Sequence, residues 1–215
     1  MMNRQRIPFT MTALLLALAS TAGLAQEMPD TMVYAEFSDP NGDTTAQGGL
    51  TYPVAYAERG NTEYAQDPSS AVGGVLTISG EFTPAKRSKW GGIGILVDNS
   101  PTPGEPGTRD MSEYTSVRVR LASDAAKTIR LRLVGPDEAV QNAGCYPLFN
   151  QTVTETLSEY TIPLSGFRPA SYCGGNGRSV AATLPQLASF EVVDAPAPVT
   201  PRRVSFQVGT IEFLR

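Results

Sequence analysis

The sequence predicts an all-β protein, a sandwich of about 8–10 antiparallel strands. Apolar and polar residues alternate in many short segments, which is the pattern of strands with one buried face. The 215 residues also include 20 glycines and 17 prolines, which fall between these segments. Glycine and proline interrupt helices but suit turns between strands, so we expect many short strands and little helix.

Two segments show the alternation most clearly, TSVRVRL at Thr115–Leu121 and TIRLRLV at Thr128–Val134. Each places its aliphatic residues on one face and its arginines on the other. The link between them is short and polar, which favours an antiparallel hairpin. In that hairpin one exposed face would carry four arginines: Arg118, Arg120, Arg130 and Arg132.

Other alternating or apolar segments predict the remaining strands: Met32–Phe37, Gly74–Ser79, Gly91–Val97, Tyr160–Leu164, Phe190–Val193, Val204–Val208 and Thr210–Leu214. Pro163 lacks a backbone N–H, which places its segment at a sheet edge or at a strand end. Polar segments rich in glycine or proline predict long loops: Asp39–Asn61, Asn99–Thr108 and Asp194–Pro201. At most one helical turn is expected, within Ser179–Leu187.

Residues 1–25 have the pattern of a secretory signal peptide. Two arginines precede an apolar run over residues 7–18, and small residues at 23–25 suit a cleavage site. A membrane anchor is the alternative, but the run is short for a span and no stop-transfer charges follow it. We therefore expect an exported protein, periplasmic or extracellular, in which residues 26–215 form a single β-sandwich domain without a membrane span.

Charge and composition disfavour several classes of function. Signal removal takes away two arginines and no acid, so the net charge of −4 becomes −6. Nucleic acids and anionic membranes are bound through basic surfaces, so we expect neither as a partner. The chain has no histidine, which excludes Ser-His-Asp catalysis, Cys-His catalysis and histidine-bound zinc. The acids show no spacing that requires a catalytic pair for glycoside hydrolysis, so we expect no enzyme activity.

The chain has two cysteines, Cys145 and Cys173. In an oxidising compartment an even number of cysteines predicts one disulfide. Two buried free thiols are the alternative. Both cysteines lie beside tyrosine and glycine, in GCYP and YCGG, which suits loop ends and favours the disulfide.

Trp90 and the four arginines are the candidate binding residues. The ring of Trp90, the only tryptophan, could stack on the flat face of a sugar or close one end of the core, and both interpretations remain open. Guanidinium groups suit carboxylates and sugar hydroxyls, and Gln207 could extend the same face. The alternative for the arginines is a solvated face with acidic neighbours: Glu155, Glu159 or Glu191.

The motif DPNGD offers a possible metal ligand set. Asp39, Asn41 and Asp43 alternate like part of a calcium loop. No glutamate occupies the final ligand position of such a loop, so an ordinary Asp/Asn/Gly turn is the preferred interpretation.

Several motifs together resemble those of galactose-binding-like jelly rolls. The segment KWGGIGILV is followed by DMSEYTSVRVRL, TIRLRLV, LSEYTIPLSGF and RRVSFQVGTIEFL. This order is most similar to family 11 carbohydrate-binding modules and to the complex I intermediate-associated protein family. The similarity covers about residues 73–213, and it extends neither to Asp39–Asn61 nor to the two cysteines.

The resemblance implies a jelly-roll β-sandwich that binds a poly- or oligosaccharide on its concave face, without catalysis. Trp90, Gln207 and the four arginines would then contact the carbohydrate. The resemblance also implies a structural calcium ion between the first and last strands, held by Glu36 and Glu212, to which Asp39 would add a ligand. No other cofactor is expected. The alternative function is an envelope structural or assembly protein that uses the same sandwich to bind a protein partner.

Overall fold

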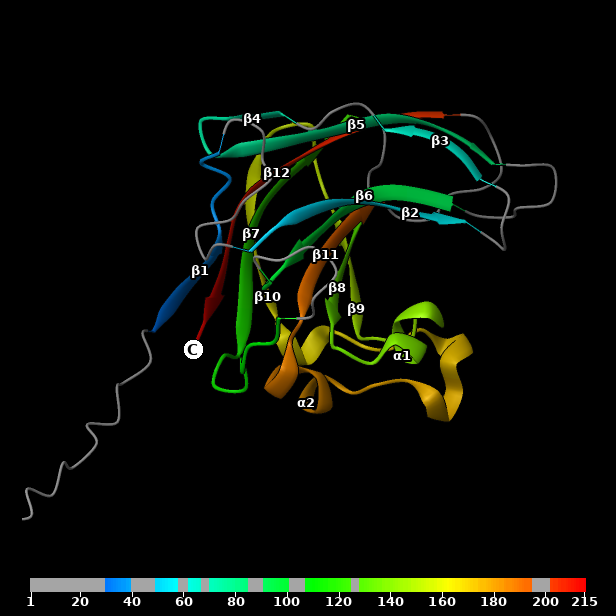
Figure 1. The fold of residues 1–215 in the computed structure, drawn as a ribbon. Coiled ribbons are helices and arrows are strands. Elements are labelled where there is room, and N and C mark those ends of the chain that lie inside the picture. The colour runs from blue at the N-terminus through cyan, green and yellow to red at the C-terminus, as the bar shows by residue number, and fades with distance from the viewer. Residues whose placement is uncertain are drawn as a thin grey trace, which may run out of the picture.

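The computed structural model describes residues 30–39, 49–57, 62–66, 70–84, 91–100, 107–124, 128–194 and 202–215. These residues form twelve strands in two antiparallel sheets with the core between them (Figure 1). The predicted all-β sandwich is confirmed, with more strands than the 8–10 expected. The predicted signal peptide lies outside the described residues.

The larger sheet has seven strands and contains the last strand at its centre. Its main path is β10 (Ser158–Pro163), β7 (Ser116–Ser123), β12 (Arg202–Leu214), β5 (Val75–Pro84) and β3 (Thr62–Gln66). In addition, β1 (Thr31–Ala35) pairs with β12, and β4 (Ser70–Val72) pairs with β5. Strand β10 ends at Pro163 and lies at the edge of this path, as its proline predicted. The two strands predicted at Val204–Val208 and Thr210–Leu214 form the single strand β12. The pairing of β12 with β7 shifts register between Val208 and Ile211, and the strand continues through this bulge.

The smaller sheet has five strands. Their order is β2 (Thr51–Ala57), β6 (Gly91–Asp98), β11 (Ser189–Asp194), β8 (Thr128–Val134) and β9 (Leu148–Thr152). Strand β2 corrects the expected loop Asp39–Asn61, and its Pro53 is accommodated because β2 is an edge strand. Strand β9 was also not predicted.

Short helical segments lie at one end of the sandwich (Figure 1). They are α1 (Glu138–Asn142), η1 (Leu164–Gly166), η2 (Ser171–Asn176), α2 (Val180–Thr183) and η3 (Leu184–Gln186). The last two lie within Ser179–Leu187 and exceed the single turn expected there, and the other three were not predicted. In the described ranges, no helix has the length and apolar character needed to cross a membrane.

The core confirms the alternation of the two arginine-bearing strands. Their inward residues are fully buried: Val117, Val119 and Leu121 of β7, and Ile129, Leu131 and Leu133 of β8. Aromatic rings fill the centre, where Tyr34 and Phe190 each meet Phe213 edge to face, with ring centroids 5.3 and 6.1 Å apart. The arginines of both strands must therefore point away from the core.

The expected hairpin between these two strands is wrong, because β7 and β8 belong to different sheets. Alternation requires only that both apolar faces meet the same core. A link that crosses between facing sheets satisfies this requirement as well as a hairpin does. Facing sheets lie about 10 Å apart, and the link from Ser123 to Thr128 is long enough to span that distance. The two arginine pairs consequently lie on opposite outer faces of the sandwich.

Candidate functional site

The candidate site is the outer face of the five-stranded sheet, which we call the five-strand face. Cross-strand pairing places residues of one parity in rows across all five strands, with their side chains on the same side. The first row is Tyr52, Leu96, Glu191, Arg132 and Leu148. The second row is Val54, Gly94, Val193, Arg130 and Asn150.

Two buried glycines of β6, Gly92 and Gly94, lie at the centre of the five-strand face. A β-carbon on Gly94 would overlap the carbonyl oxygen of Val192 on the neighbouring strand β11. A β-carbon on Gly92 would stand only 2.7 Å from the carbonyl oxygen of Asp194. The alternating glycines in GGIG are therefore required by the close approach of β6 and β11. A β-carbon at either position would also meet the side chain of Val193.

Arg132 and Glu191 form a buried ion pair within the first row. Nη1 of Arg132 lies 3.3 Å from Oε2 of Glu191, and their side chains are only 4% and 1% exposed. The sequence left two interpretations of the arginines open, ligand binding or neutralisation by acidic neighbours. For Arg132 the acidic neighbour exists, and it is Glu191, one of the three glutamates considered.

Arg130 lies beside this pair but has no ion-pair partner of its own in the described part of the chain. Its side chain is half-buried, and its Nε donates a hydrogen bond of 3.2 Å to Oδ1 of Asn150. Burial lowers the pKa of Arg130, and the neighbouring positive charge of Arg132 lowers it further. The Tyr172 hydroxyl, Glu191 and Asp194 raise the pKa of Arg130, in opposition to these effects.

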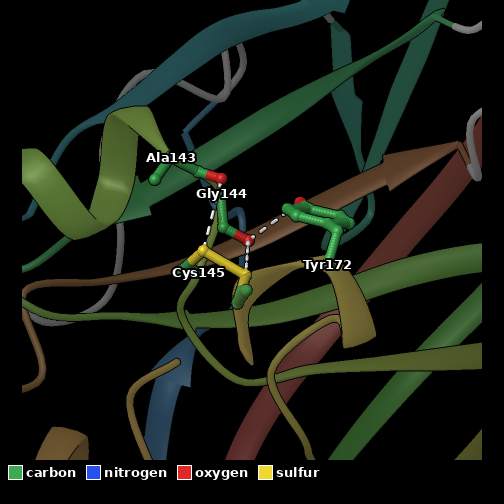
Figure 2. Close-up of a disulfide and its surroundings, with 5 residues drawn as sticks. Ala143, Gly144, Cys145 and Tyr172 are labelled. Carbon is green, nitrogen blue, oxygen red and sulfur yellow. Dashed lines mark hydrogen bonds between the residues drawn. A yellow bond between two sulfur atoms is a disulfide. The ribbon is translucent and has the colours of Figure 1, made fainter. Parts of the chain in front are cut away.

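The predicted disulfide between Cys145 and Cys173 is present, with 5.6 Å between the two Cα atoms (Figure 2). It joins the chain after α1 to the turn η2, which carries Tyr172. The Tyr172 hydroxyl donates a hydrogen bond of 3.1 Å to the Gly144 carbonyl oxygen, while the side chain is 69% exposed. Figure 2 shows this tyrosine pointing toward Gly144 beside the two sulfur atoms.

Gly144 brings the tyrosine and the arginines together. It has a φ of +69°, a backbone conformation that favours glycine. A β-carbon at this position would also stand 2.7 Å from the Tyr172 hydroxyl oxygen and 4.0 Å from Nη2 of Arg132. The hydroxyl of Tyr172 and the guanidinium of Arg132 therefore flank the same backbone segment. The disulfide-linked segment thus lies over the first row at Arg132, and it carries the exposed ring of Tyr172.

Tyr172 and Tyr52 complete the face, and neither was among the predicted site residues. Tyr52 lies in the first row on the edge strand β2, and burial followed by the charge of Asp98 raises its pKa. Tyr52 was hidden because its strand was expected to be a loop. The available signal for Tyr172 was its position directly before Cys173 in YCGG, in the only pair of cysteines of the chain.

Three of the other predicted residues, Arg118, Arg120 and Gln207, lie on the outer face of the seven-stranded sheet. Nε of Arg118 donates to Oε2 of Glu212 at 2.6 Å and lies 4.0 Å from Oε2 of Glu159. Arg120 is exposed and pairs across the strands with Glu159. Gln207 points outward from β12 and lines a small pocket of about 150 Å³. Arg118, Arg120 and Gln207 therefore share a face, but that face does not include Arg130 and Arg132, contrary to the expectation.

The calcium site expected from Glu36, Asp39 and Glu212 stays a prediction. Glu212 is engaged by Arg118, and Glu36 is exposed after the end of β1. Among the described residues, no group of three or more histidine, cysteine, aspartate or glutamate side chains is placed to hold a metal ion. Asn41 and Asp43 of the DPNGD motif lie outside the described residues, as does Trp90.

Comparisons with known proteins support the fold. Neither a protein-family model nor a curated protein matches the chain. Among solved structures, the chain is similar to the family 11 carbohydrate-binding module of the cellulosomal cellulase Lic26A-Cel5E of Clostridium thermocellum. The identity is 16% and the TM-score 0.53, over 86% of this chain and 94% of that one. It is also similar to the solution structure of CtCBM11, with 13% identity and a TM-score of 0.52 over 88% and 97% of the chains. The fold is that of a carbohydrate-binding-module-like jelly roll. The relation to the complex I family stays a prediction.

Proposed function

We propose that this chain is an exported, non-catalytic protein that binds a poly- or oligosaccharide on the five-strand face. The observation that carries the proposal is the combination found there: the half-buried Arg130, whose Nε is held by Asn150, and the exposed ring of Tyr172 on the disulfide-linked segment. The jelly-roll fold supports it, because the similar structures named above include carbohydrate-binding modules.

The chemistry of this face suits a sugar. The apolar C–H face of a pyranose ring packs on an aromatic ring, and hydroxyl groups require hydrogen-bond donors and acceptors around it. Tyr172 supplies an exposed ring, while Arg130 and Asn150 supply both donors and acceptors.

Export and the lack of catalysis are part of the same proposal. The disulfide fits an oxidising compartment, in agreement with the signal peptide that residues 1–25 predict. The absence of histidine and of any paired spacing of acids supports binding without turnover.

A screen of residues 26–215 against soluble polysaccharides in affinity electrophoresis tests the proposal. At least one polysaccharide should retard the protein, and no reducing ends should be released from it. A Trp90→Ala variant should bind more weakly if the ring contacts sugar, or melt at a lower temperature if the ring is part of the core. If no glycan retards the protein, binding of carbohydrate is excluded as its function.

A second candidate function is a structural or assembly role with a protein partner. One observation favours it, an apolar pocket of about 590 Å³ at the helical end of the sandwich. It lies beside α2 and is lined by Tyr114, Leu164, Val180 and Leu184, among others. A negative glycan screen would make this pocket the first surface to test.

A further inference from the structure

We propose that the five-strand face selects an acidic sugar, whose carboxylate binds Arg130 while its ring packs on Tyr172. This inference rests on the proposed function and names the substrate class of that same site. The ligand would be a glycan that contains uronic acid residues.

The first step of the argument is the charge balance around Arg130. Of the two nearby carboxylates, Glu191 is paired with Arg132 at 3.3 Å, and Oδ1 of Asp194 accepts a hydrogen bond of 2.6 Å from the backbone N–H of Ile93. The Arg130 side chain makes its described hydrogen bond through Nε to a neutral amide. A half-buried guanidinium without a dedicated carboxylate is costly, because buried charges are normally paired.

The second step is the geometry of the guanidinium group. Nε of Arg130 is held by Asn150, and neither Nη atom has a hydrogen-bond partner in the described residues. Two adjacent N–H donors match the two oxygens of a carboxylate in a planar, bidentate contact. A neutral hydroxyl accepts from only one donor and brings no charge to offset the desolvation. The free donors of Arg130 therefore favour a planar anion.

The third step is the fixed position of Tyr172. Its ring is the most exposed aromatic side chain of the described residues, and its hydroxyl is bonded to Gly144. The disulfide at the neighbouring Cys173 ties this turn to the segment over Arg132. A ring whose position is already fixed in the free protein loses little conformational entropy when a ligand binds. The same sugar residue can thus contact the ring with its C–H face and Arg130 with its carboxylate.

The net charge of −4 does not oppose this inference. At physiological ionic strength, charges beyond about 8 Å are largely screened, so the groups next to the carboxylate decide. These groups are Arg130, the ion pair of Arg132 with Glu191, and Asp194, whose Oδ1 accepts a hydrogen bond from the backbone N–H of Ile93.

The experiment compares charged and neutral forms of the same sugar by calorimetry on residues 26–215. The probes are trisaccharides of galacturonate, glucuronate and mannuronate, the methyl esters of all three, and one sulfated trisaccharide. At least one uronide should bind at least about 10-fold more tightly than its ester, because an ionic hydrogen bond is stronger than a neutral one. Arg130→Gln should weaken uronide binding by about 10- to 100-fold and leave ester binding nearly unchanged.

Matched variants separate this site from the rest of the surface. Arg120→Gln removes an exposed arginine from the opposite sheet and should leave every affinity unchanged. Tyr172→Ala should weaken the uronide and its ester alike, whereas Tyr172→Phe should retain stacking. Thermal melting of each variant identifies any loss of folding.

The outcomes distinguish this inference from the proposed function. Equal binding of each uronide and its ester, or tighter binding of the sulfated probe, overturns the carboxylate assignment and leaves carbohydrate binding intact. Failure of all seven probes has the same consequence if another glycan retards the protein in electrophoresis. Failure of every glycan overturns both.

Discussion

Arg132 and Glu191 face each other across β8 and β11, with 3.3 Å between Nη1 and Oε2 and almost no access to solvent. The pair lies on the outward side of its sheet, where a sandwich normally presents solvated residues. It is covered in part by the segment at Gly144, which approaches Nη2 of Arg132. The disulfide-linked segment thereby turns a surface position into a second buried layer.

Removal of one partner of this pair should be strongly destabilising. We expect Arg132→Met to lower the free energy of unfolding by about 3–5 kcal/mol, because Glu191 would remain buried without its cation. The double variant Arg132→Met, Glu191→Leu should recover much of that loss. Denaturant unfolding of the single and double variants measures the coupling. Arg118→Met, which breaks a more exposed pair, should cost about 1 kcal/mol or less. Equal losses for the two arginines would contradict the burial of Arg132.

The disulfide should contribute to stability as well as position Tyr172. Cys145 and Cys173 are 28 positions apart, and closing such a loop stabilises a protein by about 3.5 kcal/mol in the chain-entropy treatment. The double variant Cys145→Ser, Cys173→Ser should lose a comparable amount in denaturant unfolding. Thiol titration of the denatured, unreduced protein should find no free thiol, and two reactive thiols would refute the bond.

Gly94 should not tolerate a side chain. A β-carbon there overlaps the carbonyl oxygen of Val192, which is backbone and cannot turn aside. We expect Gly94→Ala to destabilise the protein by about 1–3 kcal/mol through overpacking. Gly175→Ala is the matched control, since no atom lies within 4 Å of the added carbon, and its melting temperature should stay close to that of the unmodified protein.

Asp137 should make the free energy of unfolding depend on pH in the acidic range. The hydrogen bond from Arg178 at 2.8 Å lowers the pKa of Asp137, and the backbone N–H groups of Ala139 and Val140 at the start of α1 also stabilise its charge. A pKa that is lower in the folded state means that this stabilisation is complete above about pH 4 and is lost as the pH falls through the folded pKa.

The Asp137→Asn variant keeps a capping side chain but cannot ionise. Its deficit in stability relative to the unmodified protein should therefore shrink between pH 6 and pH 2. Arg178→Gln should move the pKa of Asp137 up toward its ordinary value, as measured by NMR titration. A pKa that does not change in this variant would show that the capping N–H groups alone hold it down.

The fold was predictable where a residue type or pattern determines one structural feature, such as which face of a strand is buried or whether a strand lies at a sheet edge. Alternation in TSVRVRL and TIRLRLV determined which side chains are buried, and Pro163 placed β10 at an edge. Alternation does not determine which sheet a strand joins. The spacing of the arginines therefore could not predict that they are divided between two faces. That choice depends on long-range pairing, such as β11 with both β6 and β8.

The candidate site was predictable only in part for the same reason. Arg130 and Arg132 carried a recognisable anomaly, and Glu191 was already one of their possible acidic neighbours. The role of Tyr172 depends on a turn that the disulfide brings to the five-strand face from a distant part of the chain. The pairing of Arg118 with Glu212 likewise required the three-dimensional arrangement.

Strand β12 lies between β7 and β5 and also pairs with β1. Those three strands therefore lack their common neighbour until synthesis has reached Leu214. Because such non-local pairing is slow and exposes unpaired edges, the seven-stranded sheet cannot be completed on the emerging chain. The proposed export requires a polypeptide that stays unfolded while it crosses a membrane, and this order of assembly suits that requirement because the sheet closes only after β12 has arrived.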